Sequence, residues 1–256
     1  MRGRPNRRIR LVTEGRPSPP TMDTAISRAQ LDRVAAGAEP ETLRLHRPGP
    51  IVAFGPKDRL APGYGPAVGA AAQRGFGSVQ RLAGGRAAVF HEETIAFSWA
   101  IPDPTPREGI RARFEELAAL MATAFRSLGV DARVGEVRGE YCPGEHSVNA
   151  RGRTKTMGVG QRLIAGAAHV GGVVVVGGAG RVREVLVPVY EALELSWDPA
   201  TAGSLEDEVQ GLTWDGAAGA IVAAFEERFV LKPDTLSAET LALAEELAPS
   251  FAATER

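Results

Sequence analysis

Cysteine, long apolar runs and an excess of charge of either sign are all missing or scarce in this sequence. One cysteine among 256 residues cannot form an internal disulfide, which is typical of a reducing compartment, so we expect a cytoplasmic protein. No apolar run approaches the ~20 residues of a membrane span, and the basic N-terminus lacks the apolar segment of a secretory signal. A net charge of −1 gives no reason to expect a nucleic acid or a membrane as partner.

Lysine is almost as scarce as cysteine. Lys57, Lys155 and Lys232 are the three lysines, and every other basic side chain is arginine. Lys155 and Cys142 both lie in the glycine-rich stretch 139–176. Burial can tune the pKa of a lysine for proton transfer, whereas arginine stays charged. A lysine in such a stretch invites a chemical explanation, although a surface lysine and an inert, buried cysteine would also satisfy the pattern.

The other reactive residue types match no familiar metal or nucleotide signature. Glycine-rich turns recur, as at 83–87 and 158–160, and glycine lets a backbone come close to a ligand. None of these turns follows a strand and opens a helix, as a dinucleotide fingerprint or a P-loop requires. We expect no metal site, because the four histidines have no metal-ligand spacing with one another or with the cysteine: they are His46, His91, His146 and His169.

Hydrophobic periodicity predicts short strands with helices inserted between them. Strands are expected at 8–12, 41–46, 51–54, 77–82, 87–91, 94–101, 147–150, 156–160 and 172–176, with a further one at 182–188. Helices are expected at 22–36, 66–74, 106–128, 213–229 and 237–247. Because the strands come as hairpins, such as 41–46 with 51–54, rather than in βαβ alternation, the predicted class is α+β, with a mixed, largely antiparallel sheet flanked by helices.

The chain length fits one domain. We expect residues 1–7 to be disordered and residues 8–256 to form a single domain whose segment 205–256 is helical. The central helix has the clearest boundary signals, since Thr105 and Glu108 have the spacing of a capping box and Gly129 is placed to end the helix.

Two segments taken together resemble a known family. Residues 80–92, QRLAGGRAAVFHE, are similar to the "RRxTGGxAVxHD" motif of the biotin/lipoate protein ligase superfamily, and residues 155–162, KTMGVGQR, are similar to its "KIxGSAQR" motif. Residues 42–45 and 51–55 also resemble the "TLRLY…VSLG" strand pair of that family. The chain is therefore identified as a member of the superfamily, on the side of lipoate–protein ligase A and the protein octanoyltransferases.

This resemblance implies a set of site residues. Lys155 falls on the active-site lysine of the family, where its ammonium would stabilise negative charge on the acyl oxygen. Cys142 would be the acylated nucleophile of a cysteine-dependent octanoyltransferase. The other residues that the resemblance assigns to substrate binding are Arg81, Gly84, Gly85, Arg86, His91, Asn149, Gly158 and Gln161.

The superfamily offers two chemistries. In the octanoyltransferases, acyl carrier protein delivers an octanoyl thioester, and no further cofactor is needed. In the ligases, ATP with Mg²⁺ activates lipoate as an acyl-adenylate. Both modify a lysine of a lipoyl domain, which belongs to the glycine cleavage H protein or a 2-oxoacid dehydrogenase subunit. In a third interpretation, the protein has kept the fold but only binds acyl groups or carrier domains, without turnover.

Three features favour the octanoyltransferase reading. The first glycine turn reads GGR rather than GGG, Cys142 stands thirteen residues before Lys155, and the accessory domain of long ligases has no counterpart in the sequence. The thiol pKa would be lowered by a nearby cation such as Lys155. Asn149 keeps the alternative open, because it could equally be the polar residue that ligases place near the adenylate.

Overall fold

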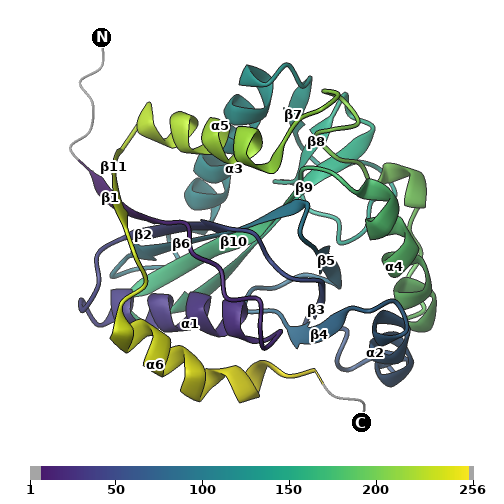
Figure 1. Cartoon of the computed structure of the whole chain (residues 1–256), viewed down its shortest axis with the longest axis horizontal. Coiled ribbons are helices and arrows are strands. Elements are labelled where there is room, and N and C mark those ends of the chain that lie inside the picture. Colours follow the sequence, from purple (N-terminus) through teal and green to yellow (C-terminus); the bar gives the residue numbers. More distant parts are fainter. Residues whose placement is uncertain (1–6, 254–256) are drawn as a thin grey trace.

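The computed structural model describes residues 7–253, and they form two sheets with six α-helices packed around them (Figure 1). The predicted α+β class is confirmed. The predicted disorder of residues 1–6 lies outside the described residues, and Arg7 forms an ion pair with Glu41. The helices are α1 (Met22–Ala35), α2 (Tyr64–Ala72), α3 (Ile110–Ser127), α4 (Ala179–Ala192), α5 (Trp214–Glu226) and α6 (Ala238–Leu247).

The large sheet has eight strands in the order β11-β1-β2-β6-β10-β9-β8-β7. Strand β1 pairs in parallel with β2 and with β11, and the other pairs of this sheet are antiparallel. The strands are β1 (Arg8–Val12), β2 (Thr42–His46), β6 (Thr94–Pro102), β7 (Ala132–Val134), β8 (Val148–Ala150), β9 (Thr154–Ile164), β10 (Ala167–Val175) and β11 (Val230–Asp234).

The small sheet has the order β4-β3-β5, with β4 parallel and β5 antiparallel to the central strand. Its strands are β3 (Ile51–Phe54), β4 (Gly77–Gln80) and β5 (Ala88–Phe90). The predicted hairpin of 41–46 with 51–54 is therefore wrong, because these strands belong to different sheets. The RPGP segment between them carries the chain from one sheet to the other.

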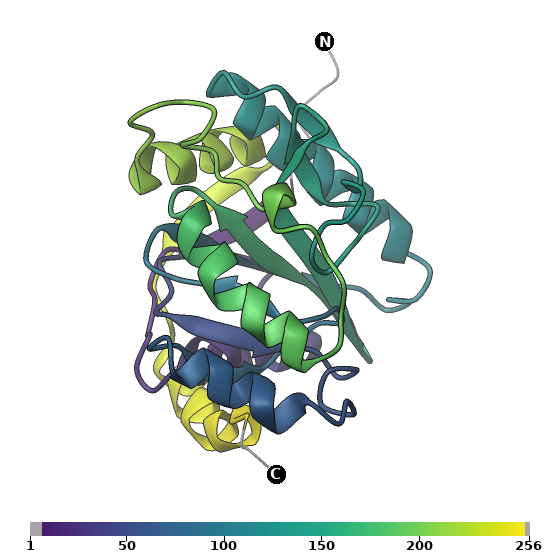
Figure 2. The ribbon, with the colours of Figure 1, turned by 90° about the vertical axis from the view of Figure 1, so that its right-hand side faces the viewer.

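Helices cover both faces of the large sheet. The apolar faces of α3 and α5 pack on one side, where Trp99 of β6 makes edge contacts with the rings of Phe225 and Phe229. Helix α1 packs on the opposite side, through Leu31 and Val34, and α6 lies against α1. The small sheet has its own apolar cluster with α2 and α4, which lie side by side in Figure 2. The cavity of the candidate site is lined by residues of both sheets.

Three further predictions are wrong. Residues 182–188 lie in α4 rather than in a strand, since Val182, Val185, Leu186 and Val189 recur at helical spacing and bury one face against the small-sheet cluster. Segment 205–256 is not all helical, because β11 lies within it.

The third error is the capping box. Helix α3 begins after Gly109 and has no side-chain cap, while Thr105 lies in the preceding turn with its N–H bonded to Asp103. No helix among residues 7–253 combines the length and the apolar composition that crossing a bilayer requires.

Close contact between β9 and β10 depends on glycine. A Cβ on Gly172 would lie 1.9 Å from the carbonyl oxygen of Gly158, so the two strands could not keep their separation. We expect Gly172→Ala to lower the free energy of unfolding by about 2–3 kcal/mol, measured by urea denaturation.

Gly219 provides the control for that prediction. It lies exposed within α5, and a Cβ added there would meet no atom within 4 Å, so Gly219→Ala should raise stability by up to about 1 kcal/mol. Equal stability of the two variants would contradict the role of Gly172.

Candidate active site

A cavity of about 390 Å³ lies where three segments meet. The segments are the glycine turn 83–87 after β4, the loop 139–147 between β7 and β8, and strand β9. The sequence-predicted residues that line this cavity are Arg81, Gly84, Gly85, Cys142, Lys155, Gly158 and Gln161. Most of the predicted set is thus brought together, although its members lie up to eighty residues apart in the chain.

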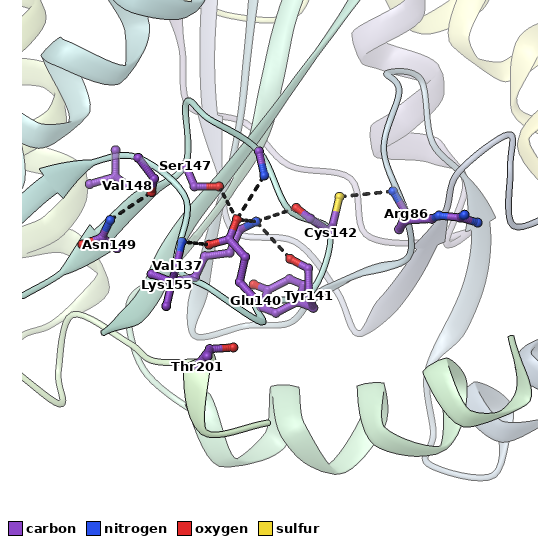
Figure 3. Close-up of polar contacts among 12 residues, drawn as sticks. Arg86, Val137, Glu140, Tyr141, Cys142, Ser147, Val148, Asn149, Lys155 and Thr201 are labelled. Atoms are coloured by element: carbon purple, nitrogen blue, oxygen red, sulfur yellow. Dashed lines mark hydrogen bonds and ion pairs between the residues drawn. The ribbon is translucent and has the colours of Figure 1, made fainter. Parts of the chain in front are cut away.

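The thiol of Cys142 lies on the cavity wall. Its Sγ accepts a hydrogen bond from the backbone N–H of Arg86 at 3.1 Å, as Figure 3 shows, and another from Nη1 of Arg81 at 3.4 Å. Arg81 Nη1 also donates to the carbonyl of Arg86 at 2.6 Å, which fixes the guanidinium beside the sulfur. Both donors favour a negative sulfur, so the site is built to hold a thiolate.

Burial raises the pKa of the Cys142 thiol, but the charges of Arg81 and Lys155 and the Arg86 amide outweigh it, so that the net pKa lies below the ordinary value. Lowering the pKa increases the thiolate fraction near neutral pH, and the thiolate is the nucleophilic form of cysteine. The surroundings of Cys142 therefore favour its thiolate form more than those of an ordinary buried cysteine do.

The backbone of Cys142 is held in a rare conformation, with φ of 44° in the left-handed region. Such a conformation costs a non-glycine residue on the order of 1–3 kcal/mol, so surrounding contacts must impose it. Its N–H donates to the hydroxyl of Tyr190 at 3.0 Å, and its carbonyl accepts from Lys155 Nζ at 2.7 Å. Tyr190 and Lys155 thus fix the backbone of Cys142, and with it the position of the thiol.

Lys155 is buried and holds the loop that carries the cysteine. Its Nζ donates to Glu140 Oε1 at 2.9 Å, to the carbonyl of Tyr141 at 3.1 Å and to that of Cys142 at 2.7 Å. These three bonds use all three protons of the ammonium. In this arrangement no N–H of Lys155 is left for an acyl oxygen, and its three bonds hold the loop in place.

Glu140 is the residue that sequence reasoning missed. Its carboxylate is fully buried and pairs with Lys155 (Figure 3). It also accepts from Ser147 Oγ at 2.8 Å, from the N–H of Gly144 at 3.2 Å and from that of Val137 at 3.0 Å. The Glu140 side chain therefore joins the two ends of the loop formed by residues 137–147. Its position two residues before the cysteine is the only sequence signal, and no spacing rule gives it weight.

The glycine turn shows why one of its two glycines is needed. Gly85 has φ of 118°, and a Cβ there would lie 2.5 Å from Arg81 Nη1 and 2.9 Å from Cys142 Sγ. A Cβ on Gly84 would meet nothing within 4 Å. The Arg86 side chain pairs with buried Asp58 at 3.1 Å, so Arg86 serves the thiol through its backbone.

Gln161 joins the far wall of the cavity to a helix. Its Oε1 accepts from Arg113 Nε at 3.0 Å, and its Nε2 donates to the carbonyl of Ile110 at 2.7 Å. These bonds tie the start of α3 to β9. Gly158, on the same strand, leaves room for the Lys155 stem, because a Cβ there would lie 3.3 Å from Lys155 Cε.

His91 and Asn149 do not line the cavity. His91 is fully buried and accepts from the N–H of Glu93 at 3.3 Å, and burial lowers its pKa to about 4, so it is neutral near pH 7. Asn149 bonds the backbone of Gly135 and Gly152. Between residues 7 and 253, no three His, Cys, Asp or Glu side chains gather in a way that could hold a metal ion.

Removing the Arg81 guanidinium should raise the pKa of the Cys142 thiol. In Arg81→Gln the thiolate loses its nearest charge, so the inflection in the pH profile of Cys142 alkylation by iodoacetamide should move to higher pH. Arg86→Gln is the matched control, since that side chain faces Asp58 and its N–H remains. An unchanged profile in Arg81→Gln would refute the role of Arg81.

The buried ion pair gives a second prediction. Glu140→Ala leaves the ammonium of Lys155 buried without its counter-charge, and should cost about 3–5 kcal/mol in the free energy of unfolding. Combining Glu140→Leu with Lys155→Met removes both charges, so urea denaturation should find the double variant more stable than Glu140→Ala. The opposite order would show that the pair is not coupled.

Comparison with known proteins identifies the family of this chain. The family model for the lipoyl protein ligase A/B catalytic domain matches residues 19–226. The octanoyl-[GcvH]:protein N-octanoyltransferase of Geobacillus kaustophilus is 30% identical over 163 residues, covering 64% of this chain and 57% of the relative. The enzyme of that name from Anoxybacillus flavithermus is 29% identical over 159 residues, covering 62% and 57%. The chain thus spans little more than half the length of these relatives.

Solved structures share the fold. A lipoate-protein ligase A bound with ATP superposes with a TM-score of 0.72 at 19% identity, covering 94% of both chains. The bipartite lipoate protein ligase of Thermoplasma acidophilum superposes with a TM-score of 0.69 at 19% identity, covering 95% of this chain and 92% of the other. With the family model matching most of its length, the chain belongs to the lipoyl protein ligase A/B catalytic domain family.

Proposed function

We propose that this protein is an enzyme that transfers an octanoyl group to a lysine of a lipoyl domain through a thioester on Cys142. One observation carries the proposal: the sulfur faces the cavity with its pKa lowered and with Arg81 and the Arg86 N–H in contact. The names of the curated relatives support the octanoyl group and the protein acceptor. Residues 8–256 would act as one catalytic domain, and a free thiol at the site suits a cytoplasmic location.

The first step forms the thioester. The Cys142 thiolate attacks the octanoyl carbonyl, a carbon–sulfur bond forms, and the bond to the donor breaks so that the donor leaves with the electron pair. As the sulfur loses its charge, negative charge appears on the acyl oxygen. The Arg86 N–H and the Arg81 guanidinium, which hold the thiolate at rest, are then the nearest donors for that oxygen.

The second step passes the chain to the acceptor. The neutral amine of the lipoyl-domain lysine attacks the thioester, forms an amide and expels the Cys142 thiolate, and the amine loses its proton to water. Arg81 and the Lys155 charge make the thiolate a better leaving group by the same lowering of its pKa that made it a nucleophile. The resting site is restored after both half-reactions.

Two proteins are candidates for the donor of the octanoyl group. The relatives' names point to octanoylated GcvH, whereas the sequence resemblance points to octanoyl-acyl carrier protein. A carrier-protein donor is a thioester and would leave as a thiolate. A lysine-bound octanoyl group is an amide and would need a proton on its departing nitrogen. We therefore propose a lipoyl-domain protein as one partner of the reaction, and mass spectrometry with each donor in turn decides between the two.

An ATP-dependent ligase is the alternative. It would need groups on this chain to hold a triphosphate with Mg²⁺. Arg81, which lines the cavity, and the Arg86 N–H already contact the cysteine sulfur. A phosphate at these donors would displace the thiolate that they stabilise, so the site supports transfer better than adenylation.

Intact-mass spectrometry tests the proposal. We expect the wild-type protein, mixed with octanoyl-GcvH or octanoyl-acyl carrier protein, to gain one octanoyl group and to pass it to an apo lipoyl domain. Cys142→Ala should gain none and transfer none, while its circular dichroism remains native. Acceptor modification only with octanoate and ATP would instead establish the ligase, and full transfer by Cys142→Ala would exclude the thioester.

A further inference from the structure

The acceptor lysine of the proposed reaction must lose a proton before it can attack the thioester. An ordinary lysine side chain is neutral in only roughly one of 2,500 molecules at pH 7. A group near the thioester that takes this proton, directly or through one water, would therefore speed the transfer. Candidates for that group are the titratable side chains on or beside the catalytic cavity.

The titratable side chains that line the cavity are not free for this purpose. Lys155 uses its three protons in bonds to Glu140 and to two carbonyls. Burial raises the pKa of Tyr141, so its phenol keeps its proton, and arginine, as at Arg81, stays charged. Cys142 carries the acyl group in this step. Among the described residues that line the cavity, none is left to act as the base.

His146 lies beside the cavity, on the loop that carries the nucleophile. Gly144 and Ser147, which flank it in the loop, both line the cavity. Its ring stacks on the ring of Phe114, another lining residue, with centroids 4.9 Å apart and an angle of 11° between the planes. This stack holds the imidazole in a fixed place next to the cavity.

The ring nitrogens of His146 are available for proton transfer. Within residues 7–253 the ring makes no hydrogen bond, and the carboxylate beside it is that of Glu145, whose Oε1 lies 3.7 Å from Nδ1. The His146 side chain is 15% exposed, so a proton that it takes can pass on to water. Histidine is also the side chain best suited to take up and release a proton near neutral pH.

The other three histidines cannot serve in this way. His46, His91 and His169 are each at most 4% exposed. Burial lowers the pKa of His46 to about 3 and those of His91 and His169 to about 4, so all three stay neutral near pH 7. Of the four histidines, His146 is thus the one that combines a place beside the cavity with contact to solvent.

Charged side chains near the ring come from two elements. Glu145 is on the same loop, and helix α3, which carries Phe114, adds Arg111 and Glu115, joined to each other at 2.7 Å. Glu115 and, to a smaller extent, Glu145 raise the pKa of Arg111, so the loop and the helix present opposite charges to each other. The carboxylate of Glu145 is the group placed to stabilise an imidazolium at this position.

We propose that His146 is the proton acceptor for the lipoyl-domain lysine. This rests on the proposed function, in which Cys142 holds the octanoyl group. One N–H bond of the ammonium breaks, the proton moves to a ring nitrogen of His146, directly or through one water, and the electron pair stays on the amine. The amine then attacks the thioester carbon, and the imidazolium releases its proton to water. With an amide donor the direction reverses, and the imidazolium supplies the proton that the departing nitrogen needs.

A single-turnover experiment separates the two half-reactions. Cys142 is loaded from a small thioester, octanoyl-N-acetylcysteamine, the loaded protein is mixed with an apo lipoyl domain, and intact-mass spectrometry follows each step. In His146→Phe, which keeps a ring to stack on Phe114 but has no proton site, loading should proceed at the wild-type rate. Transfer to the lysine should slow about 100-fold, because only this step needs the base.

Chemical rescue gives a second readout that loss of packing would not produce. His146→Gly should show the same slow transfer, and imidazole added to the solution should restore much of the rate, because it can enter the space that the side chain leaves. Imidazole should not restore His146→Phe, in which a ring fills that space. The rate of Cys142 alkylation by iodoacetamide checks that each variant keeps a folded site, and His146→Gln replaces His146→Phe if the latter does not fold.

The outcomes distinguish this inference from the proposed function. Wild-type transfer by folded His146→Phe would overturn the role of His146 and leave the thioester mechanism in place. Loading and transfer that slow by the same factor would show a structural role, and would overturn the inference too. A wild-type protein that cannot be loaded on Cys142 would overturn the proposed function, and this inference with it.

Discussion

The candidate site depends on one buried ion pair, between Lys155 on β9 and Glu140 on the loop. Both groups lie out of water, where an isolated charge would be strongly disfavoured, so each requires the other. Their remaining bonds go to the same loop, to the Ser147 hydroxyl and to backbone groups that include the carbonyl of Cys142. The same contacts therefore stabilise this part of the core and position the thiol.

The groups that contact the Cys142 thiol come from the small sheet. Loop 139–147 belongs to the large sheet, whereas Arg81 and the N–H of Arg86 follow β4 of the small one. Tyr190 of α4 joins the two, because its hydroxyl accepts from the Cys142 N–H and donates to the carbonyl of Ala87. The distance between the sheets thus sets the distance from the Cys142 sulfur to Arg81 and the Arg86 N–H, and Gly85 keeps that distance short.

Sequence reasoning found the parts of the site that are local in the chain. Cys142, Lys155 and Gly85 stand in short glycine-rich segments, so composition and motif resemblance select them. Glu140 and Asp58 acquire their roles only through partners that folding brings near, and the sequence around them carries no matching signal. The same limit applies to secondary structure. The three valines of 182–188 favour a strand, yet their spacing with the leucine also fits a helix, and burial against the small-sheet cluster decides for α4.

Strand β11 is short and polar in half of its length, so its pairing with β1 is visible only in three dimensions. That pairing has a consequence for how the protein is made. β1 lies between β2 and β11, and more than two hundred residues separate it from the latter. At translation rates of about 5–20 residues per second, β11 is synthesised roughly 10–45 s after β1. Until then one edge of β1 has open backbone donors and acceptors, which other strands can pair with. The nascent chain is therefore exposed to aggregation at this edge until β11 leaves the ribosome.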